Sequence, residues 1–89
     1  MEQNITELLK ERRTRCGDFR GHAAITQAIK NAFHASWNWG DMTPSQKEAM
    51  EMVAHKFARI LNGDPNYLDS WVDCVGYLQL VINELEGTK

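Results

Sequence analysis

Two stretches in the second half of the chain carry pairs of carboxylates at helical spacing. Glu48 and Glu51 lie three residues apart in the first stretch, and Asp69 and Asp73 lie four residues apart in the second. Residues at these spacings share one face of an α-helix, so each stretch can present two carboxylates together. Carboxylate oxygens are ligands that Mg²⁺ prefers, often together with the phosphates of a nucleotide. All four residues are therefore candidate metal ligands.

Two cations and a phenol accompany these acids. Lys56 and Arg59 follow in the first stretch, and Tyr77 lies one helical turn after Asp73. In one reading the cations neutralise phosphate oxygens, which makes Lys56, Arg59 and Tyr77 the candidate substrate-binding residues. In the other reading the cations pair with Asp69 or Asp73 and hold two helices together, because structural ion-pair networks commonly imitate functional clusters. Both readings remain open at this point.

The glutamates also have a structural alternative. Glu51 lies four residues before His55, an ordinary pairing on a solvent-exposed helix face. The three histidines, His22, His34 and His55, do not have the sequence spacing of a zinc-binding triad.

Capping signals and hydrophobic spacing predict that both stretches are helices. Thr43, Pro44 and Gln46 form a capping-box sequence, and Asn62-Gly63 ends the helix that follows. The next helix follows residues 64–66 and runs to about Glu86. The predicted apolar stripe of the first of these helices comprises Ala49, Met50, Val53, Phe57, Ile60 and Leu61. That of the second comprises Trp71, Cys74, Val75, Leu78, Val81, Ile82 and Leu85, with Leu80 on the face of the acids.

Two further helices are predicted in the first half of the chain. One covers roughly residues 4–14, with Asn4 as a candidate cap, and the other covers roughly residues 22–38. Residues 17–21 read as a loop, in which Asp18 could cap the second helix. The apolar stripe of that second helix comprises Ile25, Ala28, Ile29, Ala32 and Phe33.

Length and composition predict one small domain. The chain has 89 residues and a net charge of −2, which does not favour binding to a nucleic-acid backbone. Four helices and no strand predict an all-α antiparallel bundle, and its small core predicts a homodimer or larger assembly. Cys16 and Cys74 lack the spacing of a metal or redox motif, so we expect two free thiols in a reducing cytosol. No run approaches about 18 apolar residues, so we expect no membrane span.

A glycine and three tryptophans stand out on these elements. Gly76 in the middle of a helix is unfavourable, which predicts the close approach of another backbone or a ligand. Trp37, Trp39 and Trp71 could stack on bases, although burial at a helix or subunit contact explains them more simply.

Three segments resemble known proteins. They are Gly17-Asp18-Phe19, residues 55–64 (HKFARILNGD) and residues 69–77 (DSWVDCVGY), and together they look like a small family of uncharacterised proteins from bacteriophages and prophages. More distantly, the chain is similar to the MazG-like all-α nucleoside-triphosphate pyrophosphohydrolases. Glu48-x-x-Glu51 matches the first acidic cluster of those enzymes, and Asp73 matches the last acid of the second. Ser70 stands where that second cluster has glutamate, and Asp69 is one residue away.

The resemblance implies an accessory protein in the cytoplasm of a bacterial host. It predicts a MazG-like domain that binds an NTP or dNTP, with Mg²⁺ as a possible cofactor and pyrophosphohydrolase activity left open. The alternative is a non-enzymatic helical module that contacts a phage or host protein. A DNA-binding helix-turn-helix is disfavoured because Asp69, Asp73, Glu84 and Glu86 would repel phosphate.

Overall fold

The computed structural model describes residues 5–87, which form an all-α bundle of four helices and a short 3₁₀ helix, without strands in that range. The elements are α1 (Ile5–Cys16), α2 (Phe19–Ala35), η1 (Trp39–Asp41), α3 (Pro44–Asn62) and α4 (Leu68–Leu85). The predicted fold class is therefore confirmed. Within residues 5–87 no helix has both the length and the apolar character needed to cross a membrane.

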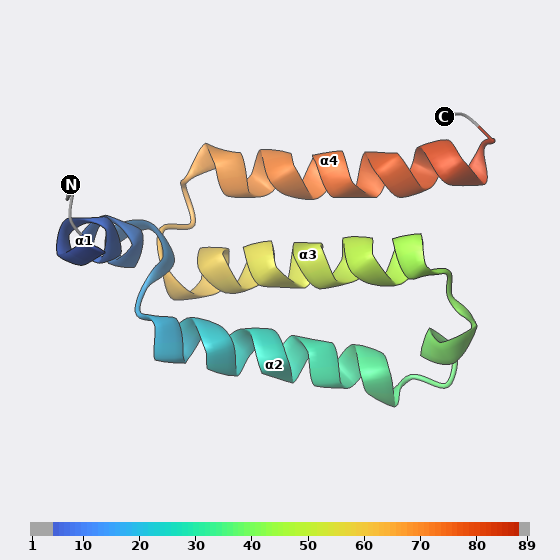
Figure 1. Cartoon of the computed structure of the whole chain (residues 1–89), viewed down its shortest axis with the longest axis horizontal. Helices are drawn as coiled ribbons and strands as arrows, with labels where there is room; N and C mark the ends of the chain where they lie inside the picture. Colours follow the sequence, from blue (N-terminus) through green and yellow to red (C-terminus); the bar gives the residue numbers. More distant parts are fainter. Residues whose placement is uncertain (1–4, 88–89) are drawn as a thin grey trace.

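Helix α3 lies at the centre of the bundle (Figure 1). It packs against α2 on one side and α4 on the other, and the three helices run side by side with alternating direction. Helix α1 crosses the end of this layer and contacts both α2 and α3. We expected α3 and α4 to form the central pair of the bundle because their apolar stripes are the longest. The two helices do pack together, but only α3 is central, and α4 lies at the edge of the layer.

Local capping explains where the helices begin and end. The capping box of α3 is present, with Gln46 N donating to Thr43 Oγ1 and Thr43 N donating to Gln46 Oε1. Asp18 caps α2 by accepting a hydrogen bond from the Gly21 amide at 3.0 Å. Because this cap places residues 19–21 in the first turn, the predicted loop over 17–21 is too long and α2 starts three residues early.

The other boundaries differ from the prediction by a few residues. Helix α1 ends at Cys16 rather than 14, where Gly17 adopts a φ of 75° that favours glycine. The predicted cap at Asn4 lies outside the described residues. Helix α2 ends at Ala35 rather than 38, because the chain turns so that Trp39 in η1 stacks on Phe33, with ring centroids 5.5 Å apart.

The core of the single chain is small. Among residues 5–87, the buried apolar residues are Ala49, Val53, Ala54, Ala58, Ile60 and Cys74, and no large side chain in that range is completely buried. This confirms the inner part of the α3 stripe, but Phe57 and Leu61 are exposed. On α2 the buried positions are His22 and Thr26 rather than the predicted apolar stripe.

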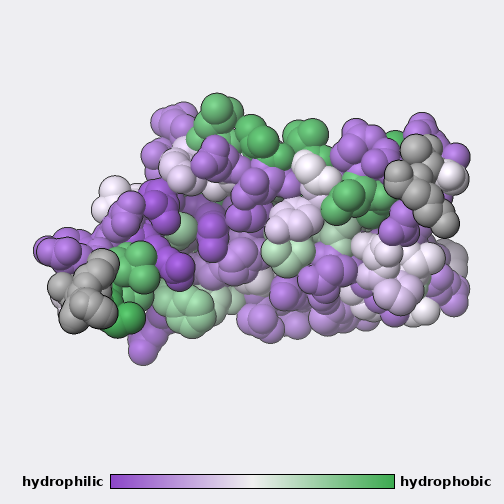
Figure 2. All heavy atoms as spheres, turned by 45° about the horizontal axis from the view of Figure 1, so that its top comes forward, coloured by the Kyte–Doolittle hydropathy of each residue, from purple (hydrophilic) through white to green (hydrophobic). Residues whose placement is uncertain are grey.

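Most of the predicted apolar stripe of α4 is also exposed. Only Cys74 of that stripe is buried, while Trp71, Val75, Leu78, Ile82 and Leu85 face away from the rest of the chain. The stripe was expected to pack inside the bundle, but α4 packs mainly against α3 and therefore buries only one of its faces. In Figure 2, hydrophobic side chains accordingly gather along the edge that α4 forms at the top of the view.

Candidate functional site

Lys56 and Asp73 form the contact between the predicted groups of α3 and α4. Lys56 Nζ lies 2.9 Å from Asp73 Oδ2. The lysine side chain is only 12% exposed, whereas the aspartate is 45% exposed. A nearly buried ammonium requires a compensating charge, so Asp73 stabilises Lys56 in this position. This pairing was one of the two readings of the sequence.

Glu51 and Asp69 lie elsewhere. Glu51 points toward α2, where its Oε2 lies 3.1 Å from His34 Nε2, instead of pairing with His55 along its own helix. Asp69 lies at the exposed start of α4, where the Tyr67 hydroxyl donates to it at 3.5 Å. Each of these two carboxylates thus has a partner other than Lys56, and the α3 and α4 acids do not form one compact cluster within residues 5–87.

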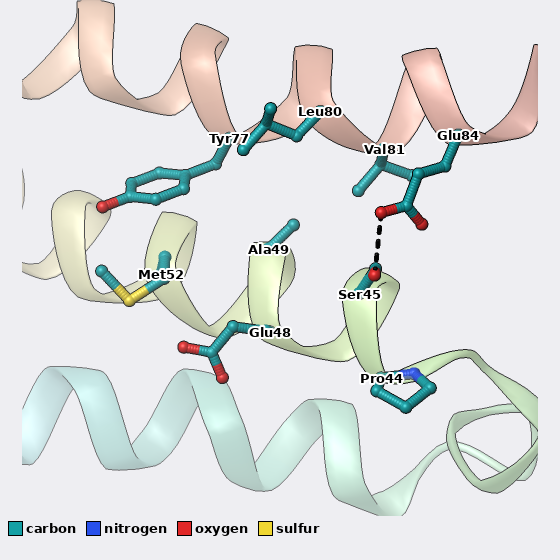
Figure 3. Close-up of a pocket in the computed structure, with 9 residues that line it drawn as sticks. All are labelled: Pro44, Ser45, Glu48, Ala49, Met52, Tyr77, Leu80, Val81 and Glu84. Atoms are coloured by element: carbon teal, nitrogen blue, oxygen red, sulfur yellow. Dashed lines mark hydrogen bonds between the residues drawn. The ribbon is translucent and has the colours of Figure 1, made fainter. Parts of the chain in front are cut away.

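Glu48 and Tyr77 line a pocket between α3 and α4 (Figure 3). The pocket has a volume of about 530 Å³, and its walls include Met52, Leu80 and Val81. At its far end Ser45 Oγ donates to Glu84 Oε2 at 3.0 Å. The site is thus largely apolar, with two carboxylates, a phenol and the Ser45 hydroxyl as its polar side-chain groups.

The four candidate metal ligands therefore lie in four different environments. Within residues 5–87, no group of three or more His, Cys, Asp or Glu side chains is placed to hold a metal ion. A Mg²⁺ ion at Glu48, Glu51, Asp69 or Asp73 stays a prediction, and it would need ligands from a substrate as well.

Two histidines that the sequence separates by 33 residues meet between α2 and α3. His22 Nε2 lies 3.2 Å from His55 Nδ1, and the two rings meet edge to face. Thr26, one turn after His22, donates to the His22 carbonyl at 2.8 Å. His22 is buried, and its Nδ1 has no hydrogen-bond partner. The polar pair of His22 and Thr26 at helical spacing was the sequence signal that could have revealed this contact.

Burial and nearby cations keep both rings neutral. Burial lowers the pKa of His22, and Arg59 lowers it further. The pKa of His55 is lowered to about 4, first by burial and then by the charges of His22, Arg59, Lys56 and Lys30. Both histidines are therefore neutral, and the positive charge near them comes from Arg59, Lys56 and Lys30.

In one reading of the sequence Arg59 pairs with Asp69 or Asp73. The structure contains no such ion pair within residues 5–87. It lines a second pocket with His22 and His55 on one side and the side chains of α1 on the other. Arg59 lies three residues after Lys56, which turns it about 60° away from the α4 side of α3. Sequence reasoning missed this second pocket, because it depends on how α1 crosses α3.

The structure also places the two cysteines and two of the tryptophans, Trp37 and Trp71. Cys16 and Cys74 are free, as predicted, and burial raises the pKa of the Cys74 thiol. Trp71 Nε1 donates to the Pro65 carbonyl at 2.8 Å, and Trp37 is exposed.

A scan against protein-family models found no match for this chain. Searches of curated proteins and of solved structures likewise found no significant match.

Proposed function

We propose that this chain is a MazG-like nucleotide-binding domain, which binds an NTP or dNTP along one face of α3. The observation that carries the proposal is the order of side chains on that face. Glu48, Met52, His55 and Arg59 follow one another at intervals of three or four residues, so they form a continuous row. The row begins in the pocket between α3 and α4 and ends in the pocket beneath α1.

The two ends of this row suit different parts of a nucleotide. The pocket at Glu48 has apolar walls with few polar groups, which is typical of sites for a planar organic ring. Tyr77 supplies an aromatic face there. Arg59 at the other end carries a permanent charge for phosphate oxygens. The volumes of about 530 and 470 Å³ lie within the range of small-molecule sites.

Magnesium would enter this site with the nucleotide. Mg²⁺ is commonly held by one or two carboxylates together with substrate phosphates. Glu48 forms no ion pair with another residue in the range 5–87, and Asp73 lies one turn before Tyr77 on α4. These two carboxylates are our preferred ligands. A metal-activated water attacking the α-phosphorus would release pyrophosphate and a nucleoside monophosphate.

A thermal-shift screen of nucleoside triphosphates with and without Mg²⁺ tests the proposal. A nucleotide present at 100 times its Kd should raise the free energy of unfolding by about 2.7 kcal/mol. Tyr77→Ala should weaken this effect, and Glu48→Gln should remove its Mg²⁺-dependent part. Glu51→Gln is the matched control on the same helix, because Glu51 is engaged by His34. Absence of any shift at millimolar nucleotide would overturn the proposal, and a pyrophosphate-release assay would separate hydrolysis from binding.

A second candidate function, association with another protein chain, is favoured by the outer stripe of α4. Its residues are Leu68, Trp71, Val75, Leu78, Ile82 and Leu85, and each is between 44% and 71% exposed. They are separated by three, four, three, four and three residues, which is the spacing of a coiled-coil seam. No charged residue interrupts the stripe. We call these six residues the α4 seam.

The α4 seam fits a second copy of this chain. In an antiparallel pairing of two α4 helices, position 68 of one chain faces position 85 of the other, 71 faces 82, and 75 faces 78. All three pairs are symmetric about the same point in the middle of α4. Each residue of the seam then meets another residue of the seam, as a two-fold interface requires. Antiparallel pairing also brings opposite ends of the two helix dipoles together.

The exposed area of the chain agrees with this assembly. A folded monomer of 10.2 kDa is expected to expose about 5,300 Å². This chain exposes 6444 Å², which is more by about 1,100 Å². A stable interface of standard size covers about 800 Å² on each partner. The excess is therefore of the size that one partner would cover.

Light scattering at tens of micromolar should report a dimer. Leu78→Glu places a charge in the middle of the seam and should give monomers. Leu80→Glu is the matched control, because Leu80 is equally apolar but lies on the opposite side of α4. A monomeric parent chain would overturn self-association, and it would direct the search toward a phage or host protein as the occupant of the seam.

A further inference from the structure

The pocket beneath α1 has walls from three helices. Leu9, Arg12 and Arg13 come from α1, Phe19 and His22 from α2, and His55 and Arg59 from α3, with Gly17 and Asp18 in the connecting segment. Its volume of about 470 Å³ could hold a phosphate group with part of the molecule that carries it.

Three arginines around this pocket lack acidic partners. Arg12, Arg13 and Arg59 form no ion pair with another residue in the part of the chain that the structure describes. Their neighbour Arg15 behaves differently, since it binds Glu11 at 3.1 Å and lies over the Tyr67 ring. Arg20 on α2 likewise forms no ion pair among the described residues, but it does not line the pocket, so the pocket is where three unpaired arginines come together.

The remaining groups of the pocket do not cancel this charge. Asp18 is the one carboxylate among the lining residues, and it is engaged in capping α2. His22 and His55 are neutral, because burial and nearby cations lower the pKa of each ring. The lining therefore carries three guanidinium groups against one carboxylate. An anion that entered the pocket would supply the missing negative charge.

One residue that lines the pocket, His22, has a buried polar atom without a partner among residues 5–87. His22 Nδ1 is buried and has no hydrogen-bond partner, although buried polar groups are nearly always paired. His22 is itself a lining residue of the pocket. The wall of the pocket at His22 therefore holds a polar atom whose hydrogen-bonding capacity the single chain does not use.

The position of α1 over the pocket is fixed by direct contacts with the end of α3. The Asn62 side chain donates to the carbonyls of Cys16 and Asp18, at 3.0 and 2.9 Å. The Asp64 amide donates to the Arg15 carbonyl at 2.8 Å. A Cβ at Gly17 would overlap Asn62, so the two segments touch without a gap. The backbone at the end of α1, which carries Arg12 and Arg13 in its last turns, is therefore held against α3.

We propose that Arg12, Arg13 and Arg59 bind a phosphate group of a small phosphorylated molecule in the pocket beneath α1. Guanidinium groups bind phosphate through paired, charge-assisted hydrogen bonds, which a single lysine cannot provide. The pocket lies at the Arg59 end of the α3 row, so the inference deepens the proposed nucleotide function and rests on it for the nucleoside part of the ligand only. It assigns to α1 a binding role that none of the candidate residues of α3 and α4 covers.

Calorimetric titration at fixed ionic strength tests the inference, with inorganic pyrophosphate and a nucleoside triphosphate as probes. The variant R12Q/R13Q should weaken pyrophosphate binding at least tenfold, and Arg59→Gln should do the same. Arg20→Gln is the matched control, because Arg20 is exposed like Arg12 and Arg13 but does not line the pocket. It should change the affinity less than twofold. Circular dichroism would establish that all variants remain helical.

The outcomes separate this inference from the proposed function. If the triphosphate binds and R12Q/R13Q binds it equally well, the inference is wrong while the nucleotide function stands. If pyrophosphate binds in an arginine-dependent way and the nucleoside adds no affinity, the inference stands and the nucleotide function is wrong. Equal losses in R12Q/R13Q and R20Q would indicate nonspecific charge attraction and would overturn the site. Tighter binding of a single-stranded oligonucleotide than of any small phosphate would overturn the assignment to small molecules.

Discussion

The junction at the end of α3 and the outer helix α4 differ in how completely one chain packs them. At the junction, Asn62 binds the carbonyls of Cys16 and Asp18, and neither Gly17 nor Gly63 has room for a Cβ atom. On α4, a Cβ at Gly76 would meet no atom within 4 Å. The junction is therefore complete within the single chain, whereas α4 retains an apolar face that only another molecule could cover.

The two kinds of recognition that we propose therefore lie in separate regions. The junction combines close backbone contacts with unpaired arginines, which suits a small charged ligand. The α4 seam is long, apolar and uncharged, which suits another helix. Lys56 and Asp73 connect the two regions across α3 and α4. Substitutions in each region should therefore have different sizes and different readouts.

The largest effect is expected at the junction. In Gly17→Ala, the alanine would have to adopt a φ of 75°, which residues with a Cβ atom disfavour. The Cβ of this alanine would also overlap Asn62. We expect a loss of about 3 kcal/mol or more in the free energy of unfolding, from strain and displaced hydrogen bonds together. Gly40→Ala is the control, because a Cβ there meets nothing within 4 Å, and it should change stability by less than about 0.5 kcal/mol. Urea denaturation followed by circular dichroism measures both; similar values would mean that the junction yields easily.

The histidine pair should make stability depend on pH. The folded pKa of His55 is about 4, below its usual value near 6.5, so the unfolded chain binds the extra proton first. The contribution is fully present above about pH 6.5 and is lost as the pH falls toward 4. Allowing for solvent screening, we expect a loss of about 1–2 kcal/mol across this window.

Urea denaturation at several pH values checks this expectation. His55→Asn should reduce the slope, whereas His34→Asn, which removes an exposed histidine beside Glu51, should leave it in place. Equal slopes in all three proteins would show that the acid sensitivity has another source.

A smaller effect is expected where the two regions are connected. Asp73→Asn leaves the nearly buried Lys56 without its carboxylate, but Asp73 is half-exposed and water can partly replace it. We expect a loss of about 1 kcal/mol, and about zero for the control Asp69→Asn, whose carboxylate is exposed. If Asp73 is mainly a metal ligand, its removal should instead leave the metal-free protein unchanged or more stable and abolish Mg²⁺-dependent nucleotide stabilisation. Chemical denaturation with and without Mg²⁺ and nucleotide distinguishes the two.

The features that sequence predicted well are local or have one obvious partner. The capping box at Thr43 and Gln46 depends on residues three positions apart, and the structure contains it as expected. Lys56 and Asp73 could be matched because adjacent antiparallel helices were expected to pack face to face. The all-α fold follows from the same helical periodicity.

The features that sequence missed depend on the path of the chain between helices. Asn62 was interpreted only as part of a helix stop, whereas its side chain holds the end of α1. Arg59 was assigned to the α4 side, because the crossing of α1 over the other side of α3 could not be read from periodicity. The hydrophobic pattern of α4 also gives no means of distinguishing a buried stripe from one that awaits a partner.

The smallest effect, and the one that tests the interpretation of α4 most directly, is expected from Gly76→Ala. The sequence predicted that a backbone or ligand lies close to this glycine, but within the single chain the surrounding space is open. An alanine there should raise the free energy of unfolding by about 0.5–1 kcal/mol, because it removes the entropic cost of glycine in a helix. In the antiparallel pairing the α4 seam lies on a different face, so association should be unchanged. Denaturation combined with light scattering checks both. A variant that is less stable or associates more weakly would indicate that a second chain approaches α4 at Gly76, and the pairing proposed for the seam would then have to be rotated toward that face.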